Sequence, residues 1–552
     1  MAGVQITTTE GSPDAQMSIR VRGGGSITQS NEPLFIVDGF PVESISDIPP
    51  TDIESIDVLK DASSTAIYGA RGANGVIIVT TKSGKEGKVS VSYNAYYAWK
   101  KVAKTLDVLS ASDYTKWQYE LAQLTNKNDD YIKYFGNYQD LDMYDNVATN
   151  DWQDLTFGRT GHSFNHNLSI NGGSDKFKYS FSYSHIDDKA IMQMSDYARD
   201  NLNLKLNHKP LKNVSLDFSA RFSKTKINGG GSNDANSSLN TDKRLKYSLL
   251  YTPYPVPGIS DALNADEEDA NSLLINPLIS LRDNDTRKER INYNLAGSIT
   301  WEIIKDLKLK AEVGYDDYRN NADRYYGVTT YYVRNNVDDE DKSKPAISFT
   351  RGTRTAFRST NTLSYDFKKF FKNNKNHLNL LAGQEYIVTR ERELRNVVHG
   401  FPTEYTADDC INYSTKGNPY EVTNYGYPDD VLFSFFGRAN YDFDSKYLFS
   451  ATFRADGSSK FAKGNQWGFF PSAAVAWRIS SESFMENTKN WLDDLKLRFS
   501  YGTAGNNNIP SGQISQLYEL NKTPWINGVN SYIAPSKYMA NSDLTWETTI
   551  TR

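Results

Sequence analysis

Apolar and polar residues alternate in a series of short segments along most of this chain. In the segment 89–99 every second residue is Val, Tyr, Ala or Trp, and the residues between them are mainly Ser, Asn and Tyr. Because the side chains of a β-strand point alternately to its two faces, each such segment predicts a strand with one apolar face. We count thirteen segments, and a fourteenth begins at Leu544. They lie near residues 89–99, 164–170, 177–183, 202–206, 214–222, 293–301, 307–315, 351–367, 377–388, 431–441, 447–455, 473–479 and 495–501.

Short and long connections follow one another between these segments. Links such as 172–175, 207–213 and 442–446 are short, whereas 100–161 and 227–288 are long, polar stretches that we expect to be loops. A transmembrane β-barrel has short turns on one rim and long loops on the other, and soluble sandwiches do not separate loop lengths in this way. The pattern therefore predicts an antiparallel, all-β transmembrane barrel.

The alternation also predicts which face of a strand meets lipid. In the segment 447–455, Phe449 and Ala451 alternate with Ser450, Thr452 and Arg454. A membrane barrel places apolar residues outside and polar residues in its lumen. We therefore expect Ala451 to face lipid and Thr452 to face the lumen.

Residues 34–85 have a different pattern, typical of a small mixed α/β unit. Residues 34–37 predict a short buried strand, and residues 76–81 predict a β-branched strand. Between them Asp61 is expected to cap a short helix, and Gly69 is placed where a left-handed C-terminal cap favours a residue without Cβ. The chain is thus expected to begin with a compact unit ahead of the barrel.

Composition narrows the classes of partner and of membrane segment. A net charge of -5 and a pI near 5.8 argue against a nucleic-acid partner, which needs a concentrated basic surface. The single cysteine, Cys410, excludes an intramolecular disulfide. The mean hydropathy is -0.62 and no apolar run approaches the length of a transmembrane helix. A barrel remains compatible, since only every second residue of its strands faces lipid.

Motifs for catalysis or metal binding are weak. His162 and His166 lie about two strand repeats apart with no carboxylate base between them, and the glycines of 69–75 follow a helix without a phosphate-loop lysine. The acidic runs at 266–269 and 338–341 lack the spacing of a calcium loop, so solvated loop charge explains them better. No nucleophile, base and orienting group can be assembled. We expect no enzyme activity, no cofactor and no metal.

The long connections are rich in aromatic residues. Tyr and Trp present flat faces that stack on sugar rings and supply contact area at little entropic cost. Packing within the loops and placement at the membrane interface explain such residues equally well. The candidate substrate contacts are Trp117, Tyr131, Tyr325, Tyr326, Tyr331 and Tyr332.

Two groups of segments resemble a known family. The run DIESIDVLKDASSTAIYGARGANGVIIVTTKSGK at 52–85, with IRVRG at 19–23 and Asp38, Gly39 and Pro41, resembles the plug domain of SusC-like, TonB-dependent outer-membrane transporters. The segments FGRANYDFDSKYLFSATFRADGSSKF and FFPSAAVAWRIS resemble the barrel of the same family. The resemblance thus extends over nearly the whole chain.

The resemblance implies a domain organisation. Residues 1–86 would be a plug that lacks its beginning, since no secretory signal is recognisable at the start of the chain. Residues 87–552 would be the first part of the barrel, about 13–14 of the about 22 strands of such transporters. We therefore expect a curved open sheet with residues 19–85 on its concave side, and not a closed barrel.

The resemblance also implies function and partners. A SusD-like surface lipoprotein would cap the barrel in the outer membrane of a Gram-negative cell, and an oligosaccharide or peptide would bind between them. The TonB-ExbB-ExbD complex would pull on the plug to open a path, through a TonB box ahead of this chain. The alternatives are a siderophore or metal-chelate receptor of the same architecture and a passive porin or structural barrel, which needs no plug. The sequence does not name the substrate.

Overall fold

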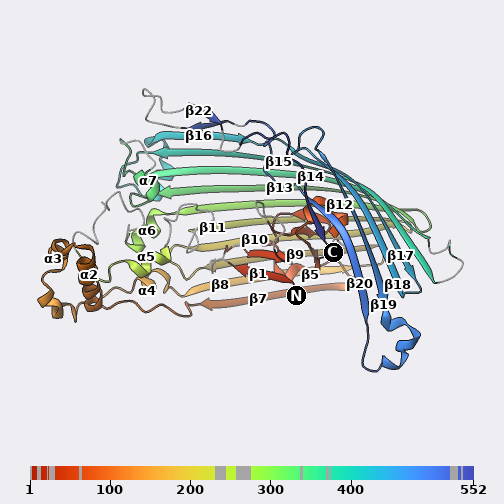
Figure 1. Cartoon of the computed structure of the whole chain (residues 1–552), viewed down its shortest axis with the longest axis horizontal. Coiled ribbons are helices and arrows are strands. Elements are labelled where there is room, and N and C mark those ends of the chain that lie inside the picture. Colours follow the sequence, from red (N-terminus) through yellow and green to blue (C-terminus); the bar gives the residue numbers. More distant parts are fainter. Residues whose placement is uncertain are drawn as a thin grey trace.

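A computed structural model of the chain describes most of its residues. These are residues 3–8, 14–15, 17–21, 23, 31–60, 65–229, 244–256, 275–335, 340–367, 371, 375–516, 518–521, 532–535 and 539–551. No helix in these ranges is long and apolar enough to cross a membrane. The dominant feature is a large antiparallel sheet, and a smaller unit lies against its inner face (Figure 1).

Fifteen strands form the large sheet, and fourteen of them follow one another in the order β23-β20-β19-β18-β17-β15-β14-β13-β12-β11-β10-β9-β8-β7. β16 pairs with β15 beside this path. The strands are β7 Gly87–Lys100, β8 Gly161–Gly173, β9 Phe177–Lys189, β10 Asp196–Leu211, β11 Val214–Asn228, β12 Thr286–Ile304, β13 Leu307–Tyr326, β14 Ala346–Asp366, β15 Asn376–His399, β16 Asn418–Gly426, β17 Asp430–Phe443, β18 Tyr447–Ser458, β19 Trp467–Arg478, β20 Lys496–Asn506 and β23 Glu547–Thr551.

The sheet is curved but does not close. Its two end strands, β7 and β23, are not hydrogen-bonded to each other in the described ranges. Figure 1 shows the small unit, in red, inside the curve. The expectation of an open sheet around the N-terminal unit is therefore confirmed.

All fourteen strands expected from the alternation are present in the large sheet, and the sheet contains one further strand that was not expected. β16 lies inside the stretch 391–429, which the sequence pattern assigned to a loop. Its sequence, NPYEVTNYG, contains a proline and mixes polar residues on both faces, so it has no clear period of two. β14 and β15 are also longer than expected, because their polar outer ends continue the ladder beyond the apolar band.

Helices occupy the rim that carries the long connections (Figure 1). The expectation of a structureless loop at 100–161 was wrong, because four helical segments lie there. Ser110 begins the first one by accepting a hydrogen bond from the backbone N–H of Asp113. The α-helices are α2 Ala111–Thr125, α3 Asn128–Phe135, α4 Trp152–Phe157, α5 Arg244–Leu250, α6 Pro277–Asp283, α7 Tyr331–Asn335 and α8 Ala407–Asn412.

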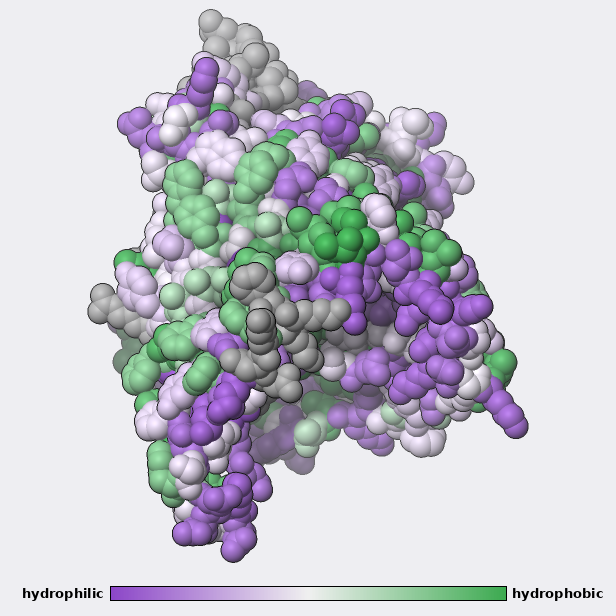
Figure 2. Space-filling model, turned by 90° about the vertical axis from the view of Figure 1, so that its right-hand side faces the viewer, coloured by the Kyte–Doolittle hydropathy of each residue, from purple (hydrophilic) through white to green (hydrophobic). Residues whose placement is uncertain are grey.

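Shorter elements lie in the N-terminal unit and in the connections between strands. The 3-10 helices are η1 Pro50–Asp52, η2 Ala66–Gly72, η3 Tyr138–Tyr144, η5 Ser414–Lys416, η6 Ile479–Ser481 and η7 Ser483–Thr488. β21 Tyr518–Asn521 and β22 Tyr532–Pro535 form a separate hairpin. Figure 2 views the molecule from the end with the short turns, where hydrophilic residues cover the right and the lower left of the face and hydrophobic residues lie mainly across its upper left and centre.

The N-terminal unit, which we call the plug after the resemblance noted above, contains a small sheet in the order β4-β3-β6-β5. Its strands are β3 Leu34–Val37, β4 Phe40–Val42, β5 Ile53–Leu59 and β6 Val76–Thr81, and β3 and β6 run parallel. Val37 and Val79 are fully buried in its core. A separate strand pair joins β1 Val4–Thr8 to β2 Met17–Val21. The small mixed unit expected from the sequence is therefore confirmed.

The helix expected near residue 61 is only partly described. Asp61 lies outside the described residues, and the segment that follows is the 3-10 helix η2. Gly69 has a positive φ of 71°, as a glycine position suggests, but its ψ of -153° is not that of a left-handed cap. It is a kink between two short helical turns, a conformation that glycine tolerates best.

The orientation of β18 agrees with the alternation. Ala451 is exposed on the outer face, and Thr452 is buried on the inner face, at 4% exposure. The assignment of outside and inside is therefore confirmed. Because Thr452 is buried and not open to a wide lumen, it is a less tolerant position than the sequence pattern suggested.

Candidate functional site

The interface between the plug and the inner wall of the sheet contains most of the buried charge in the described part of the molecule. The plug contributes carboxylates and backbone carbonyls from residues 38–52 and from η2. The strands β10 to β18 contribute mainly arginine and lysine side chains. Where a plug carboxylate forms an ion pair with the wall, its partner is therefore an arginine or a lysine.

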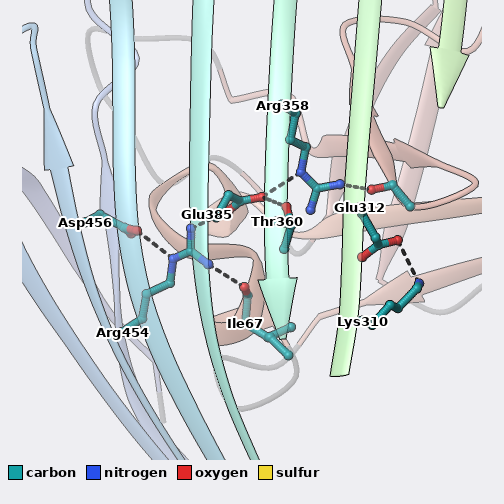
Figure 3. Close-up of polar contacts among 9 residues, drawn as sticks. Ile67, Lys310, Glu312, Arg358, Thr360, Glu385, Arg454 and Asp456 are labelled. Atoms are coloured by element: carbon teal, nitrogen blue, oxygen red, sulfur yellow. Dashed lines mark hydrogen bonds and ion pairs between the residues drawn. The ribbon is translucent and has the colours of Figure 1, made fainter. Parts of the chain in front are cut away.

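Arg454 lies at the centre of the tightest part of this interface (Figure 3). Its side chain on β18 is 1% exposed. Nε donates a hydrogen bond to Asp456 at 2.6 Å, and Nη2 donates one to Glu385 at 2.7 Å. Nη1 donates to the backbone carbonyl of Ile67 in the plug at 2.7 Å. One buried guanidinium thus joins two strands to the plug.

Glu385 on β15 connects Arg454 to a second arginine. Arg358 on β14 donates from Nε to Glu385 at 2.7 Å, and its Nη1 donates to the carbonyl of Gly39 in the plug. We call Arg358, Glu385, Arg454 and Asp456 the Arg454 cluster. Its charges are paired, which offsets the cost of burying them, and removing one partner of such a pair costs about 3–5 kcal/mol. The cluster therefore fixes the plug at two backbone positions.

Gly69 allows the plug to approach Arg454 closely. A Cβ at this position would lie 2.7 Å from Cζ of Arg454 and 2.8 Å from Oδ2 of Asp456. Both neighbours are buried and held by hydrogen bonds, so neither has room to move aside. The interface requires glycine here both for the approach and for the positive φ.

Asp38 forms the second buried contact. It stands with Gly39 in the two-residue turn between β3 and β4, where both residues have positive φ. Its carboxylate accepts hydrogen bonds from Thr81 and pairs with Nζ of Lys205 on β10 at 2.7 Å. Nη1 of Arg221 on β11 lies 4.0 Å away. The Asp38 and Lys205 side chains are each 11% exposed.

Three more cations extend the contact toward the rim of long connections. Arg354 pairs with Glu43 of the plug at 2.9 Å. Arg290 pairs with Asp14 at 2.5 Å and lies 3.9 Å from Asp47. Arg199 also donates to a plug carbonyl, that of Ser46, at 2.5 Å. The acidic side of the plug is thus matched by basic side chains from several strands.

Asp52, at the end of η1, is a buried carboxylate whose hydrogen-bond partners on the wall are neutral and which also feels the charge of Lys82. Ser182 donates to it at 2.8 Å and Asn167 at 3.4 Å. Burial raises the pKa of Asp52 above its usual range, and these two hydrogen bonds and the charge of Lys82 only partly oppose the effect. The docked plug therefore favours the protonated form of this residue.

Several cavities lie between the described parts of plug and wall, and two of them are large. One of about 390 Å³ lies toward the rim of long connections and is lined by Glu43, Arg354 and Lys460 among others. The other, of about 250 Å³, lies toward the short turns and is lined by Asp38, Lys205 and Arg358 among others. Side chains of both charges therefore border the spaces on either side of the plug.

The six aromatic candidates do not form one site. Trp117 is 51% exposed on α2, whereas Tyr131 is buried in the core of the outer helices with Tyr114 and Phe135. Burial raises the pKa of Tyr131 to about 12. Tyr325 and Tyr326 are also buried, at the end of β13.

The last two candidates lie in α7. Tyr332 is partly buried, stacks on Tyr326 and lies with its hydroxyl 3.1 Å from Nε2 of His399. The side chain of Tyr331 lies outside what the structure describes. A substrate role for the six candidates stays a prediction, and of the five with described side chains, Trp117 is the one whose surface is open.

The histidines and the acidic runs are placed as follows. His162 and His166 each lie beside a tyrosine of β7, with the hydroxyl of Tyr97 2.8 Å from Nδ1 of His162. Asp341 contacts Asn418, and the remaining residues of its run, apart from Glu340, lie outside the described ranges, as does the run at 266–269. Within the described ranges no group of three or more His, Cys, Asp or Glu side chains is placed to hold a metal ion.

Sequence reasoning missed the Arg454 cluster as a site. Its members are separated by up to about a hundred residues and come together only through the strand order. The one available signal was Arg454, a charged residue at an inward position of a strand. An inward charge in a barrel that holds a plug predicts a contact with the plug.

Two family models match the chain. The TonB-dependent receptor plug domain matches residues 1–76, and the TonB-dependent receptor-like β-barrel matches residues 231–552. The second match covers more than half of the chain.

Individual proteins are similar over the whole chain. TonB-dependent receptor SusC of Bacteroides thetaiotaomicron is 31% identical, covering 100% of this chain and 54% of that protein. TonB-dependent receptor P3 of Formosa agariphila is 30% identical, covering 99% of this chain and 51% of that protein. The chain thus spans about half the length of the curated relatives that it matches.

Solved structures share the fold. The RagAB peptide transporter superposes with a TM-score of 0.79 and 26% identity, covering 100% of this chain and 62% of that chain. The siderophore receptor PirA from Acinetobacter baumannii gives a TM-score of 0.54 at 14% identity, covering 99% of this chain and 63% of that chain. The second likeness concerns the fold alone.

Proposed function

Since this chain belongs to the TonB-dependent receptor family, we propose that the full-length protein imports an oligosaccharide or a peptide across the outer membrane of a Gram-negative cell. The cargo enters from the rim of long connections, and TonB supplies the energy by acting on the plug. A SusD-like lipoprotein on the cell surface delivers the cargo.

The observation that carries this proposal is the docking of the plug. Its contacts with the wall are strong but polar: ion pairs and hydrogen bonds to backbone carbonyls. A hydrated space can replace such contacts at lower cost than a continuous apolar core. The arrangement suits a domain that blocks the passage at rest and yields under applied force.

Relatives support the choice of cargo class. SusC and the RagAB peptide transporter are similar over the full length of the chain, at 31% and 26% identity. The siderophore receptor is similar at only 14% identity. Import of an oligosaccharide or peptide is therefore favoured over import of a metal chelate.

A binding screen on the purified full-length receptor with its lipoprotein partner tests the proposal. Glycan, peptide and ferric-chelate panels are presented in parallel. We expect binding within the glycan or the peptide panel. Binding confined to ferric chelates would favour a siderophore receptor of the same architecture.

A further inference from the structure

The charge of the wall behind the plug bears on the charge of the cargo. Lys205, Arg221 and Arg290 are 11%, 14% and 18% exposed. Within the described ranges, every carboxylate that forms an ion pair with one of these three cations belongs to the plug. The wall thus carries buried positive charge that the plug neutralises.

We propose that the imported oligomer carries carboxylates, and that these replace the plug carboxylates on the wall during passage. The inference rests on the proposed import function and adds the chemical class of the cargo. Water that fills the space left by the plug solvates these cations, and a cargo carboxylate replaces that water in a stronger, charge-assisted pair. When the plug moves aside, an anionic cargo restores the pairing of these cations, whereas a neutral cargo does not.

We place the first replacement of a plug carboxylate by a cargo carboxylate at Arg354. This arginine borders the cavity of about 390 Å³ that faces the rim of long connections. Its partner Glu43 is 61% exposed, while Arg354 is 15% exposed. Arg354 also lies 3.9 Å from Asp316 of β13, so a cargo carboxylate arriving from that side replaces Glu43, the exposed one of its two carboxylate partners. Charge-assisted, bidentate pairing favours carboxylates at such a position.

Further cations continue the path toward the short turns. Arg358 lies four residues after Arg354 on the same face of β14, about 13 Å along the strand. Arg358 and Lys205 both border the second cavity, of about 250 Å³. Their plug contacts are the carbonyl of Gly39 and the carboxylate of Asp38. Cations that contact the plug therefore border the cavities on both sides of it.

Acidic oligosaccharides and acidic peptides both carry carboxylates. An uptake assay distinguishes them in cells that express the full-length receptor with its lipoprotein partner. One arm compares a galacturonic acid hexamer with a maltose-series hexamer. The other arm compares a glutamate-rich hexapeptide with its glutamine counterpart. We expect the acidic member of one pair to be taken up about tenfold faster, and the ratio to fall as salt screens the charges.

Arg354→Gln tests the position. It should reduce uptake of the preferred acidic hexamer about tenfold more than uptake of its neutral counterpart, because any weakening of plug docking affects both hexamers alike. Arg351→Gln is the matched control, because Arg351 lies on the outer face of the same strand and pairs with Asp323. Arg351→Gln should change the uptake of neither hexamer. Heat-modified migration on gels checks that both variants assemble.

Three outcomes overturn the inference. Equal or faster uptake of the neutral hexamers would remove the charge preference while leaving import intact. An equal loss in Arg351→Gln and Arg354→Gln would assign the effect to assembly. Absence of uptake for all four hexamers would count against both the inference and the proposed function.

Discussion

At the scale of single residues, the plug is held by side chains that reach its backbone. Arg454 and Arg358 bind the carbonyls of Ile67 and Gly39, so the contact depends on the path of the plug chain and not on a plug side chain. Such a contact is sensitive to any added volume between the two partners. Gly69 is such a position, because an added Cβ would lie within 3 Å of Arg454 and Asp456.

Gly69→Ala should weaken docking of the plug by about 2–4 kcal/mol, because the new methyl group meets Arg454 and Asp456 and the positive φ is strained. Limited proteolysis of the plug in the assembled full-length receptor measures this loss. Gly23→Ala is the control, since Gly23 also has a positive φ but a methyl group added there would meet no atom of the described residues within 4 Å. Equal protection of the plug in both variants would show that the approach to Arg454 is unimportant.

Asp52 predicts a pH dependence of docking. Its pKa is raised in the docked state, so docking is strongest below the ordinary pKa of an aspartate and weakens as pH rises through the raised value. Hydrogen exchange of the plug between pH about 4 and 7 follows this change. Asp52→Asn should make the profile flatter, and an unchanged profile would assign the pH dependence to other groups.

At the scale of elements, successive side chains of β18 point in turn to the lipid face and to the lumen face. Ala451→Arg places a charge on the lipid face, which costs about 2–4 kcal/mol near the middle of the membrane. Ser450→Arg is the matched change on the inner face, where its side chain enters a cavity of about 380 Å³. Assembly of the full-length barrel should therefore fail only for Ala451→Arg. The reverse result would invert the assignment of the two faces.

In the outer helices, two substitutions distinguish an aromatic residue that packs in the core from one that is open to ligand. Tyr131→Ala removes a buried ring from the cluster with Tyr114 and Phe135, and should destabilise this segment by about 3–5 kcal/mol. Trp117→Ala removes an exposed ring and should leave the segment folded. If Trp117 contacts cargo, its loss weakens binding without increasing protease sensitivity of the segment. Unchanged affinity would leave Trp117 as a surface residue without a binding role.

The period of two predicted the strands well because the membrane imposes it on each strand separately. Trp301 and Phe449 are outward residues that the alternation alone identified. Outside the apolar band that constraint ends, which explains why β16 and the polar ends of β14 and β15 were missed. The helix beginning at Ser110 had a local signal, a serine cap with an aspartate three residues later, within a stretch whose polarity suggested a loop.

The interface was less predictable, for a different physical reason. Glu385 and Arg454 are 69 positions apart in the sequence, and their pairing follows from the order β15, β17, β18 in the sheet. An alternation pattern gives the face of each residue but not its level relative to a neighbouring strand. Register must be known before such a cluster can be assigned.

At the scale of the whole molecule, the curved sheet, the docked plug and the two cavities beside it agree with the proposed gated passage. A passive porin needs no plug, whereas an energised importer needs one that is retained at rest and yields to force. The polar character of the plug–wall contacts agrees with the second case. The decisive property is therefore the dependence of transport on the energy supply.

Uptake of labelled oligosaccharides and peptides by cells with and without TonB tests this property most directly. Both strains express the full-length receptor and its lipoprotein partner at equal surface levels. The account predicts that cargo still binds at the cell surface without TonB, while accumulation inside falls to the level of cells that lack the receptor. Accumulation that is equal in the two strains would contradict it and identify a passive channel.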